Sequence, residues 1–140
     1  MKSVAKEIIA KDIAPPAYQY THGLRVSGAD LLILSGQLAV GTDGELVGAG
    51  DFAAQAHQVF HNIEVVLNAG DASLADVVRF TVYLVRPEDG PIFWEVREQV
   101  FAKTFGLDQP FPTSTMIYVS GLVTPEFLIE IEATAAVARN

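Results

Sequence analysis

The chain has 140 residues, of which 50% are hydrophobic and 19% charged, and a formal net charge of −8 at pH 7. This length is typical of one domain with a substantial core, and the composition excludes a disordered chain. The acidic balance opposes binding to phosphate backbones, so we expect no nucleic-acid partner. We therefore expect a single globular domain over residues 1–140.

The apolar content is high for a small monomer, with a mean hydropathy of +0.29. Part of the apolar surface should then be buried between subunits, which predicts an oligomer. No apolar run approaches the about 18 residues of a membrane span, and the N-terminus lacks the hydrophobic core of a signal peptide. We expect no membrane association and a cytoplasmic location. Without cysteine there are no disulfides, and zinc would depend on histidines and carboxylates.

The first third of the chain predicts three strands, at residues 4–9, 18–26 and 31–34, with a turn at 27–30. The third strand is a continuous apolar run, which is typical of a strand covered on both faces. It stops at Ser35-Gly36-Gln37, where the glycine allows backbone or ligand to approach closely.

A long helix should begin after Asp51, a suitable N-cap, and continue to Ala69, with Gly70 ending it. Its apolar residues fall on one stripe that should pack against the sheet: Phe52, Ala56, Val59, Phe60, Ile63, Val66 and Leu67. Ser73 and Asp76 then predict a short capped turn.

The strand expected at residues 77–85 alternates between apolar and polar side chains, which indicates a half-buried strand. Its inward residues would be Val78, Phe80, Val82 and Leu84, and its outward residues Arg79, Thr81 and Tyr83. A second helix opens at Asp89-Gly90-Pro91 and ends at Gly106. Its expected apolar stripe is Ile92, Phe93, Val96, Val100, Phe101 and Phe105.

The stretch from Gln109 to Ala133 contains two β-rich runs joined by a segment rich in Gly, Pro, Ser and Thr. This pattern predicts two neighbouring strands with a long hairpin loop. In the second run, alternation puts Glu130 and Glu132 on the face opposite Ile129, Ile131 and Ala133. Because burying unpaired charge is costly, that face is either wet or gives the acids partners. One interpretation is that these glutamates act as a general acid or base that positions water. The other, which the residues alone favour, is that they face solvent or pair with an arginine of another chain.

These elements predict an α+β fold in which two helices cover one face of a mixed sheet. The other face would carry Arg79, Tyr83, Glu130 and Glu132, and a second subunit could cover it.

His57 and His61 are four residues apart on the first helix, with Glu64 three further on, a spacing that can hold a metal. All three flank the apolar stripe, where polar residues sit by default, so we expect a solvated helix face and no metal. Neither a serine nucleophile elbow nor a phosphate-binding loop is present in the sequence.

Several segments taken together resemble the reactive intermediate deaminase family (Rid, also called YjgF), small proteins that hydrolyse imines and enamines released by other enzymes. The segments are residues 20–22, 32–37, 55–67, 72–84, 112–115 and 129–133, and they follow the family's order over nearly the whole chain. The resemblance implies the chorismate-mutase-like fold, with three subunits closing a central barrel and clefts between adjacent subunits. It implies a homotrimer and no metal or organic cofactor.

The resemblance also implies site residues. Glu130 matches the glutamate that positions the attacking water, and the substrate pocket would be lined by Tyr20, Ser35, Gly36, Gln37, Trp94, Thr113 and Thr115. Active members carry an arginine that grips the substrate carboxylate, and Thr113 stands in its place. A threonine hydroxyl supplies neither a charge nor a two-pronged donor fork. Trp94 replaces the family's asparagine, and the family's Tyr-Ser-Gln motif is Tyr20-Thr21-His22 here.

Arg25, Arg79 and Arg97 are the alternatives for a relocated anion clamp, and Arg97 comes first because it lies one helical turn from Trp94. The first hypothesis is a divergent Rid-family hydrolase or deaminase acting on a small imine, enamine or related metabolite. The alternative is a non-catalytic trimeric small-molecule-binding or regulatory protein, suggested by the loss of the arginine and the asparagine. The ribonuclease label of some relatives fits poorly with the net charge of −8.

Overall fold

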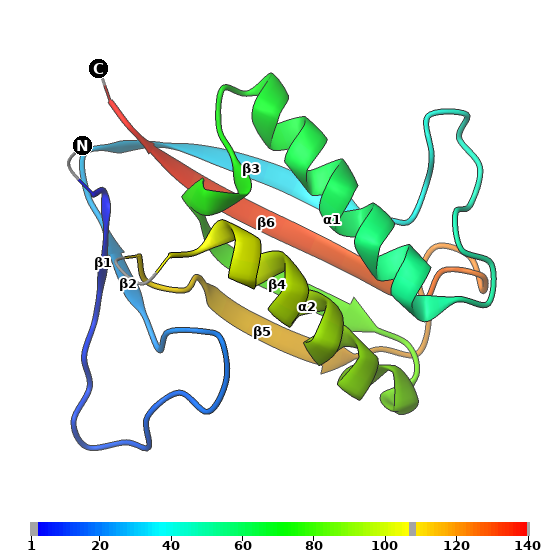
Figure 1. Ribbon diagram of the computed structural model, residues 1–140, viewed down its shortest axis with the longest axis horizontal. Helices are drawn as coiled ribbons and strands as arrows, with labels where there is room; N and C mark the ends of the chain where they lie inside the picture. Colours follow the sequence, from blue (N-terminus) through cyan, green and yellow to red (C-terminus); the bar gives the residue numbers. More distant parts are fainter. Residues whose placement is uncertain (1–2, 107–108, 140) are drawn as a thin grey trace.

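A computed structural model describes residues 3–106 and 109–139, and the predicted order of strands and helices is confirmed in it (Figure 1). The described elements are β1 (Ala5–Glu7), β2 (Leu24–Val26), β3 (Ala29–Gln37), α1 (Phe52–Ala69), η1 (Leu74–Asp76), β4 (Val77–Leu84), η2 (Pro87–Asp89), α2 (Gly90–Thr104), β5 (Thr113–Tyr118) and β6 (Ile129–Ala138). None of the helices in these two ranges has the length and apolar character needed to cross a membrane.

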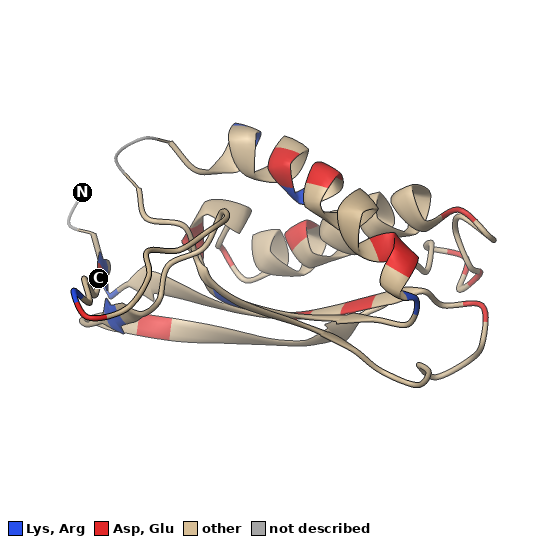
Figure 2. Ribbon diagram, turned by 90° about the horizontal axis from the view of Figure 1, so that it is seen from below, with Lys and Arg blue, Asp and Glu red and all other residues tan. Residues whose placement is uncertain are grey.

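The main sheet has four strands in the order β3-β6-β4-β5. β6 pairs antiparallel with β3 and β4, whereas β4 and β5 run parallel, so the sheet is mixed as predicted. Both α-helices lie on one face of it, and no described helix covers the other face (Figure 2). The α+β architecture of a mixed sheet backed by two helices is therefore confirmed.

The prediction that the last two strands form a hairpin is wrong. β4, α2 and β5 form a crossover unit, which returns β5 to the sheet parallel to β4. β6 then enters on the other side of β4, so β4 separates β5 from β6. Local turn signals could not reveal this order, because it depends on where the crossover helix packs.

The N-terminal strands are shorter than predicted and form a separate two-stranded sheet, in which Ala5 pairs with Val26. Between them the chain leaves strand geometry because Thr21 is anchored elsewhere. Its amide donates to the Pro112 carbonyl at 3.2 Å and its hydroxyl to the Phe111 carbonyl at 3.0 Å. This segment is thus held against the beginning of β5.

β3 begins inside the expected turn and is not covered on both faces within one chain. Leu34 faces the helices and is buried, whereas Leu31 and Ile33 are 55% and 79% exposed. The continuous apolar run therefore places two large aliphatic side chains on the face without helices.

Both long helices begin where the sequence predicts. Asp51 caps α1 by accepting a hydrogen bond from the Ala54 amide at 3.1 Å, and Gly70 follows its last turn. The predicted stripe is buried except for Val66, which is 41% exposed. The second helix ends at Thr104, two residues earlier than expected, and Ile92 of its stripe is exposed.

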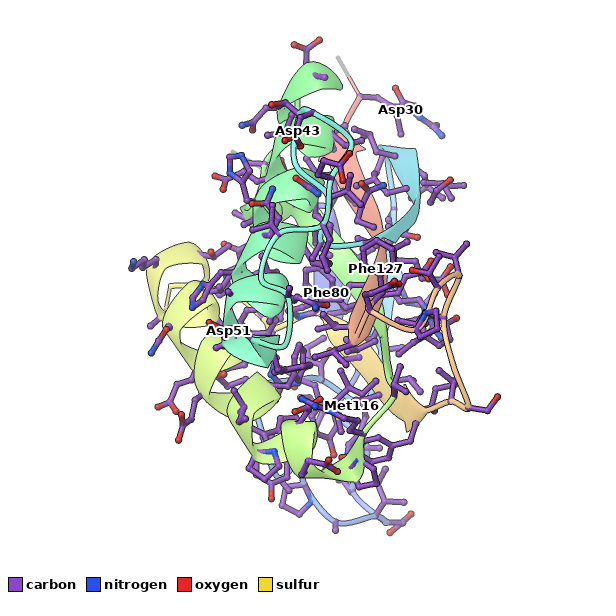
Figure 3. All side chains as sticks on the ribbon, turned by 90° about the vertical axis from the view of Figure 1, so that its right-hand side faces the viewer. Asp30, Asp43, Asp51, Phe80, Met116 and Phe127 are labelled. Carbon is purple, nitrogen blue, oxygen red and sulfur yellow. The ribbon has the colours of Figure 1, made fainter. Side chains whose placement is uncertain are left out.

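A bulge in β4 changes which valine faces the core. The register with β6 shifts between Val77 and Arg79, so Val77 is buried and Val78 only partly so. From Arg79 onward the predicted alternation holds. Phe80 lies between the helices and the sheet, with ring centroids 6.0 Å from Phe60 and 5.8 Å from Phe101 (Figure 3).

Gln55 is a fully buried polar residue on the apolar face of α1, which the apolar pattern did not predict. Its amide nitrogen donates to the carbonyls of Gly48 and Glu126, at 3.1 and 3.0 Å. Its amide oxygen accepts from the Leu128 amide at 2.9 Å. One side chain therefore fixes the loop before α1 and the entry to β6 to the same helix.

Replacing Gln55 by leucine should destabilise the protein by about 3 kcal/mol, because buried backbone groups lose their partners. Urea unfolding monitored by circular dichroism would measure the change. The matched control is Gln99→Leu on the exposed side of α2, which should stay within about 0.5 kcal/mol of the parent. A loss no larger than that of the control would contradict this role for Gln55.

Candidate functional site

The face of the sheet without helices carries two carboxylates side by side on its central strand. Ile129 and Ile131 of β6 are fully buried against the helices, whereas Glu130 and Glu132 alternate to the other face and are partly exposed. The predicted alternation of β6 is thus confirmed. On the neighbouring strand β4, Tyr83 is the register partner of Glu130.

The two carboxylates lie in a pocket of about 270 Å³. The strands contribute Gly36, Tyr83, Glu130 and Glu132, and the loop between β5 and β6 contributes Val119, Gly121 and Leu122. Phe127, labelled in Figure 3, marks the end of the same loop nearer β6. The site therefore combines a rigid sheet floor with a loop wall.

Gly36 is the residue against which the Glu130 carboxylate rests. A Cβ atom at position 36 would lie 2.0 Å from Glu130 Oε2, so no larger residue leaves the carboxylate in this place. The register of β3 and β6 shifts between Leu34 and Gln37, and this irregularity gives Gly36 its position. The sequence predicted a close approach by backbone or ligand at Gly36, whereas within the chain it is the Glu130 side chain that takes this place.

Glu130 is set apart electrostatically from ordinary surface acids. Burial, and secondly the negative charge of Glu132, raise the pKa of the Glu130 carboxyl. The Tyr83 hydroxyl donates a hydrogen bond to Glu132, and this bond raises the pKa of Tyr83. A carboxyl whose pKa moves toward neutrality is suited to exchange a proton with water or with a bound molecule.

The other predicted site residues of the sheet do not line this pocket. Ser35 is exposed, and its carbonyl accepts a hydrogen bond of 3.2 Å from the partly buried Gln37 side chain. The Thr113 hydroxyl donates a hydrogen bond of 2.9 Å to the Val78 carbonyl of β4, so this donor is already used within the sheet. Thr115 is exposed and pairs with Thr81.

Tyr20 and Trp94 lie in a different part of the chain. Trp94 is on α2 and stacks on Tyr18, with ring centroids 4.8 Å apart. Tyr20 is in the loop before β2 and meets the ring of His22 edge-on. Within one chain the structure does not bring these two side chains to the pocket of Glu130.

The three candidate arginines occupy three different environments. Arg79 is exposed and pairs in register with Thr113, where the family's arginine would stand. Arg97 is buried on the inner side of α2, and Arg25 is exposed on β2 in the small sheet. Of these, Arg79 lies next to Thr113, which is a contact that sequence spacing could not show.

A second pocket, of about 330 Å³, lies between the two helices. It includes His57, His61 and Glu64, all exposed on α1, and residues of α2 such as Lys103. In the described part of the chain no three histidine or acidic side chains come close enough to hold a metal ion.

Tyr83 and Glu132 line the pocket, but the sequence placed them only on the helix-free face and not in a site. The alternation of β4 and β6 indicated the face, whereas the pairing of these two strands, which brings Tyr83 beside Glu130, could not be read from it. Leu122 and Gly121, in the loop, gave no signal at all.

Comparison with known proteins fits this arrangement. The family model described as Endoribonuclease L-PSP matches residues 11–137. A RutC family protein of Pyrococcus horikoshii is 36% identical over 132 residues, which cover 93% of this chain and 97% of that protein. A crystal structure of a conserved Rid family protein from Yersinia pestis superimposes with a TM-score of 0.82 at 32% identity, covering 96% of this chain and 100% of that one. The chain belongs to the Rid/YjgF family.

Some Rid/YjgF relatives have a named activity, among them a 2-iminobutanoate/2-iminopropanoate deaminase of Dermatophagoides farinae, 26% identical over 133 residues. The 3-aminoacrylate deaminase RutC of Acinetobacter baylyi is 31% identical over 133 residues, which cover 94% of this chain and 98% of that protein. The family therefore includes enzymes that act on enamines.

Gly36→Ala should push the Glu130 carboxylate out of its place toward the open pocket, because the new methyl group would occupy the position of its oxygen. With less burial, the pKa of Glu130 should fall back toward that of an ordinary glutamate. Carbon-13 NMR titration of the glutamate carboxyls would measure this. Gly121→Ala is the control in the same pocket, since nothing lies within 4 Å of the Cβ it would add. An unmoved Glu130 titration in Gly36→Ala would contradict the contact.

Proposed function

We propose that this Rid/YjgF protein is a divergent hydrolase that deaminates small imines or enamines, with Glu130 as its catalytic acid and base. The observation that carries the proposal is the Glu130 carboxylate held against Gly36 in a pocket, with burial and Glu132 raising its pKa. The named activity of the Acinetobacter relative supports the same reaction class.

The chemistry requires both protons of the attacking water to leave its oxygen. In its ionised form Glu130 takes the first proton as the water oxygen attacks the carbon of a protonated C=N bond, and the protonated carboxyl gives that proton to the amine nitrogen. The carboxylate then takes the remaining hydroxyl proton as the C–N bond breaks and the carbonyl forms, and it passes this proton to the departing ammonia, which leaves as ammonium. A carboxyl with a raised pKa suits both halves, because it is neither too weak an acid nor too weak a base.

The missing arginine points to the kind of substrate. Thr113 uses its hydroxyl proton on the Val78 carbonyl and offers no charge, whereas two carboxylates face the pocket. Such a pocket favours a substrate whose only charge is a protonated imine nitrogen over a substrate that carries a carboxylate. We therefore propose imines without an anionic group close to the reacting carbon.

A homotrimer is part of this proposal. The helix-free face exposes Leu31 and Ile33 beside the acid pocket, and packing a second copy there would bury them. Assembly would also be the way for Tyr20 and Trp94 of one chain to reach the Glu130 pocket of another. Sedimentation equilibrium that found only a 15.1 kDa species in dilute solution would contradict it.

The second candidate is a binding or regulatory protein without turnover. The observation that favours it is Thr113, because its hydroxyl is engaged by the sheet and no described side chain takes over the lost charge within the pocket lining. RNA cleavage is not proposed, since the net charge of −8 opposes the approach of a polyanion.

Glu130→Gln should lower kcat for imine hydrolysis by about a hundredfold or more, the usual contribution of a positioned acid and base. Ammonia release from a panel of neutral and anionic imines generated in solution would measure it. Glu64→Gln, on the exposed side of α1, is the matched control and should leave kcat unchanged. Equal turnover in Glu130→Gln and the parent would exclude this mechanism.

The same variant has a stability readout that separates lost chemistry from lost folding. The pKa of Glu130 is higher in the folded state than in the unfolded state, so folding disfavours its ionised form. The contribution of Glu130 to the free energy of unfolding is therefore fully present below its pKa in the unfolded state. It is lost as the pH rises through its pKa in the folded state. At pH 7.5 the glutamine variant should therefore melt at the same temperature as the parent or higher.

Thr113→Arg should raise kcat/KM for carboxylate-bearing imines about tenfold to a hundredfold, because a charge-assisted hydrogen bond is worth about 1.5–3 kcal/mol. Thr113→Met fills a similar length without charge and should give no such gain. A panel of anionic and neutral imines separates the two effects. If the arginine variant gains nothing on the anionic imines, the pocket has been remodelled more widely than by the loss of one arginine.

A further inference from the structure

Tyr83 and Glu132 form a diagonal pair across two strands of the acid pocket. The register sets Tyr83 opposite Glu130 and Thr81 opposite Glu132. The Tyr83 hydroxyl nevertheless donates its hydrogen bond to Glu132, a diagonal that a long aromatic side chain can span. It therefore binds the second carboxylate of the strand face and leaves the one directly opposite, Glu130, against Gly36.

The Tyr83 hydroxyl is the only side-chain donor among the residues that line the pocket. The bond to Glu132, together with burial and the charge of the same carboxylate, raises the pKa of Tyr83. The phenol consequently stays protonated at neutral pH and its proton is used on Glu132. It is a permanent support for that carboxylate and offers no donor to a bound molecule.

The bond from Tyr83 reaches Oε1 of Glu132 only. The other oxygen, Oε2, accepts no hydrogen bond from a residue of 3–106 or 109–139, and no lysine, arginine or histidine lines the pocket. Acids elsewhere on the chain are paired, since Asp89 binds Arg86 at 2.8 Å and Asp30 binds Arg139 at 3.0 Å. Glu132 is thus fixed through one oxygen and open to a donor at the other.

A carboxylate held in this way, in a pocket lined by no cation, suits a ligand that brings its own N–H donor and positive charge. We propose that Tyr83 is a positioning residue and that Glu132, held by it, binds the nitrogen of the protonated C=N group of the substrate. This inference rests on the proposed deaminase function, in which Glu130 acts on water and exchanges protons with the same nitrogen. The two acids then have separate tasks, binding for Glu132 and proton transfer for Glu130.

Acetamidinium is the probe, because it has the planar carbon, the N–H donors and the single positive charge of a protonated imine. Acetamide is its neutral counterpart, and ammonium is the cation without the planar carbon. Isothermal titration calorimetry of the full-length protein should show saturable binding of acetamidinium. Acetamide and ammonium should bind at least about tenfold more weakly, since each lacks part of the charge-assisted donor fork.

The variants are Glu132→Gln, which keeps the shape and loses the charge, and Tyr83→Phe, which loses only the hydroxyl. Glu132→Gln should lower acetamidinium affinity about tenfold to a hundredfold, the effect of one charge-assisted bond. Tyr83→Phe should lower it about threefold to tenfold, because Glu132 remains but is no longer held. In the Glu132→Gln background Tyr83→Phe should have no further effect, a coupling that general loss of structure would not produce.

Tyr118→Phe is the matched control. Its hydroxyl donates to the Pro87 carbonyl at 3.3 Å, outside the pocket, so this variant should bind acetamidinium like the parent. Melting temperatures of all variants show that each is folded. On imines, Glu132→Gln should raise KM about tenfold and leave kcat at its pH optimum nearly unchanged, the opposite of the effect expected for Glu130→Gln.

Each of three results would overturn the proposal. The first is equal acetamidinium affinity in Glu132→Gln and the parent, or no saturable binding at all. The second is acetamide binding as tight as that of acetamidinium, which would show that the charge is not recognised. The third is Tyr83→Phe that melts lower but binds the probe like the parent, which would make the diagonal pair a stabilising contact alone. Probe binding uses no turnover, so these failures are distinct from an unchanged turnover in Glu130→Gln, which would exclude the deaminase mechanism.

Discussion

The two-residue alternation of β6 is the constraint on which the structure depends. As the strand between β3 and β4, β6 supplies both the floor of the core and the acids of the pocket. A slip of one residue would turn Glu130 and Glu132 under the helices and expose Ile129 and Ile131, so the core itself holds the register. Gln55 reinforces this from α1 by binding the Leu128 amide, two residues before Glu130. The position of the acid pair is therefore guaranteed by packing on the opposite face.

Two identical carboxylates on one strand face are given different properties by their neighbours. The Tyr83 hydroxyl donates a hydrogen bond to the Glu132 carboxylate. Glu130 rests against Gly36 instead, where burial and the charge of Glu132 favour its protonated form. The two carboxylates therefore differ in their contacts, since Glu132 has a hydroxyl donor and Glu130 has a glycine backbone beside it. A carboxyl whose pKa is raised in this way suits the acid and base role that we propose for Glu130.

What the sequence could predict was local. The N-cap and the apolar stripe place α1 within a residue, and the alternation of β4 and β6 identifies the polar face, because both signals depend on neighbours along the chain. The pairing of β5 with β4, the bulge that turns Val77 inward and the three bonds of Gln55 depend on contacts between distant segments. For the same reason Gly36 and Glu130, which line the pocket, could be named from the sequence, while Tyr83 could not be placed beside them. The family resemblance supplied the fold that local patterns left open.

The distribution of arginines within the chain bears on the kind of substrate that the acid pocket could hold. Thr113 leaves the acid pocket without a guanidinium, and its register partner Arg79 is exposed to solvent, where a charge is well screened. The one arginine removed from solvent, Arg97, lies on the other side of the sheet among aromatic rings. The acid pocket therefore has only the solvated guanidinium of Arg79 on its own face, while the buried guanidinium lies across the sheet. The neutral imine that we propose as substrate needs the acids and no such clamp.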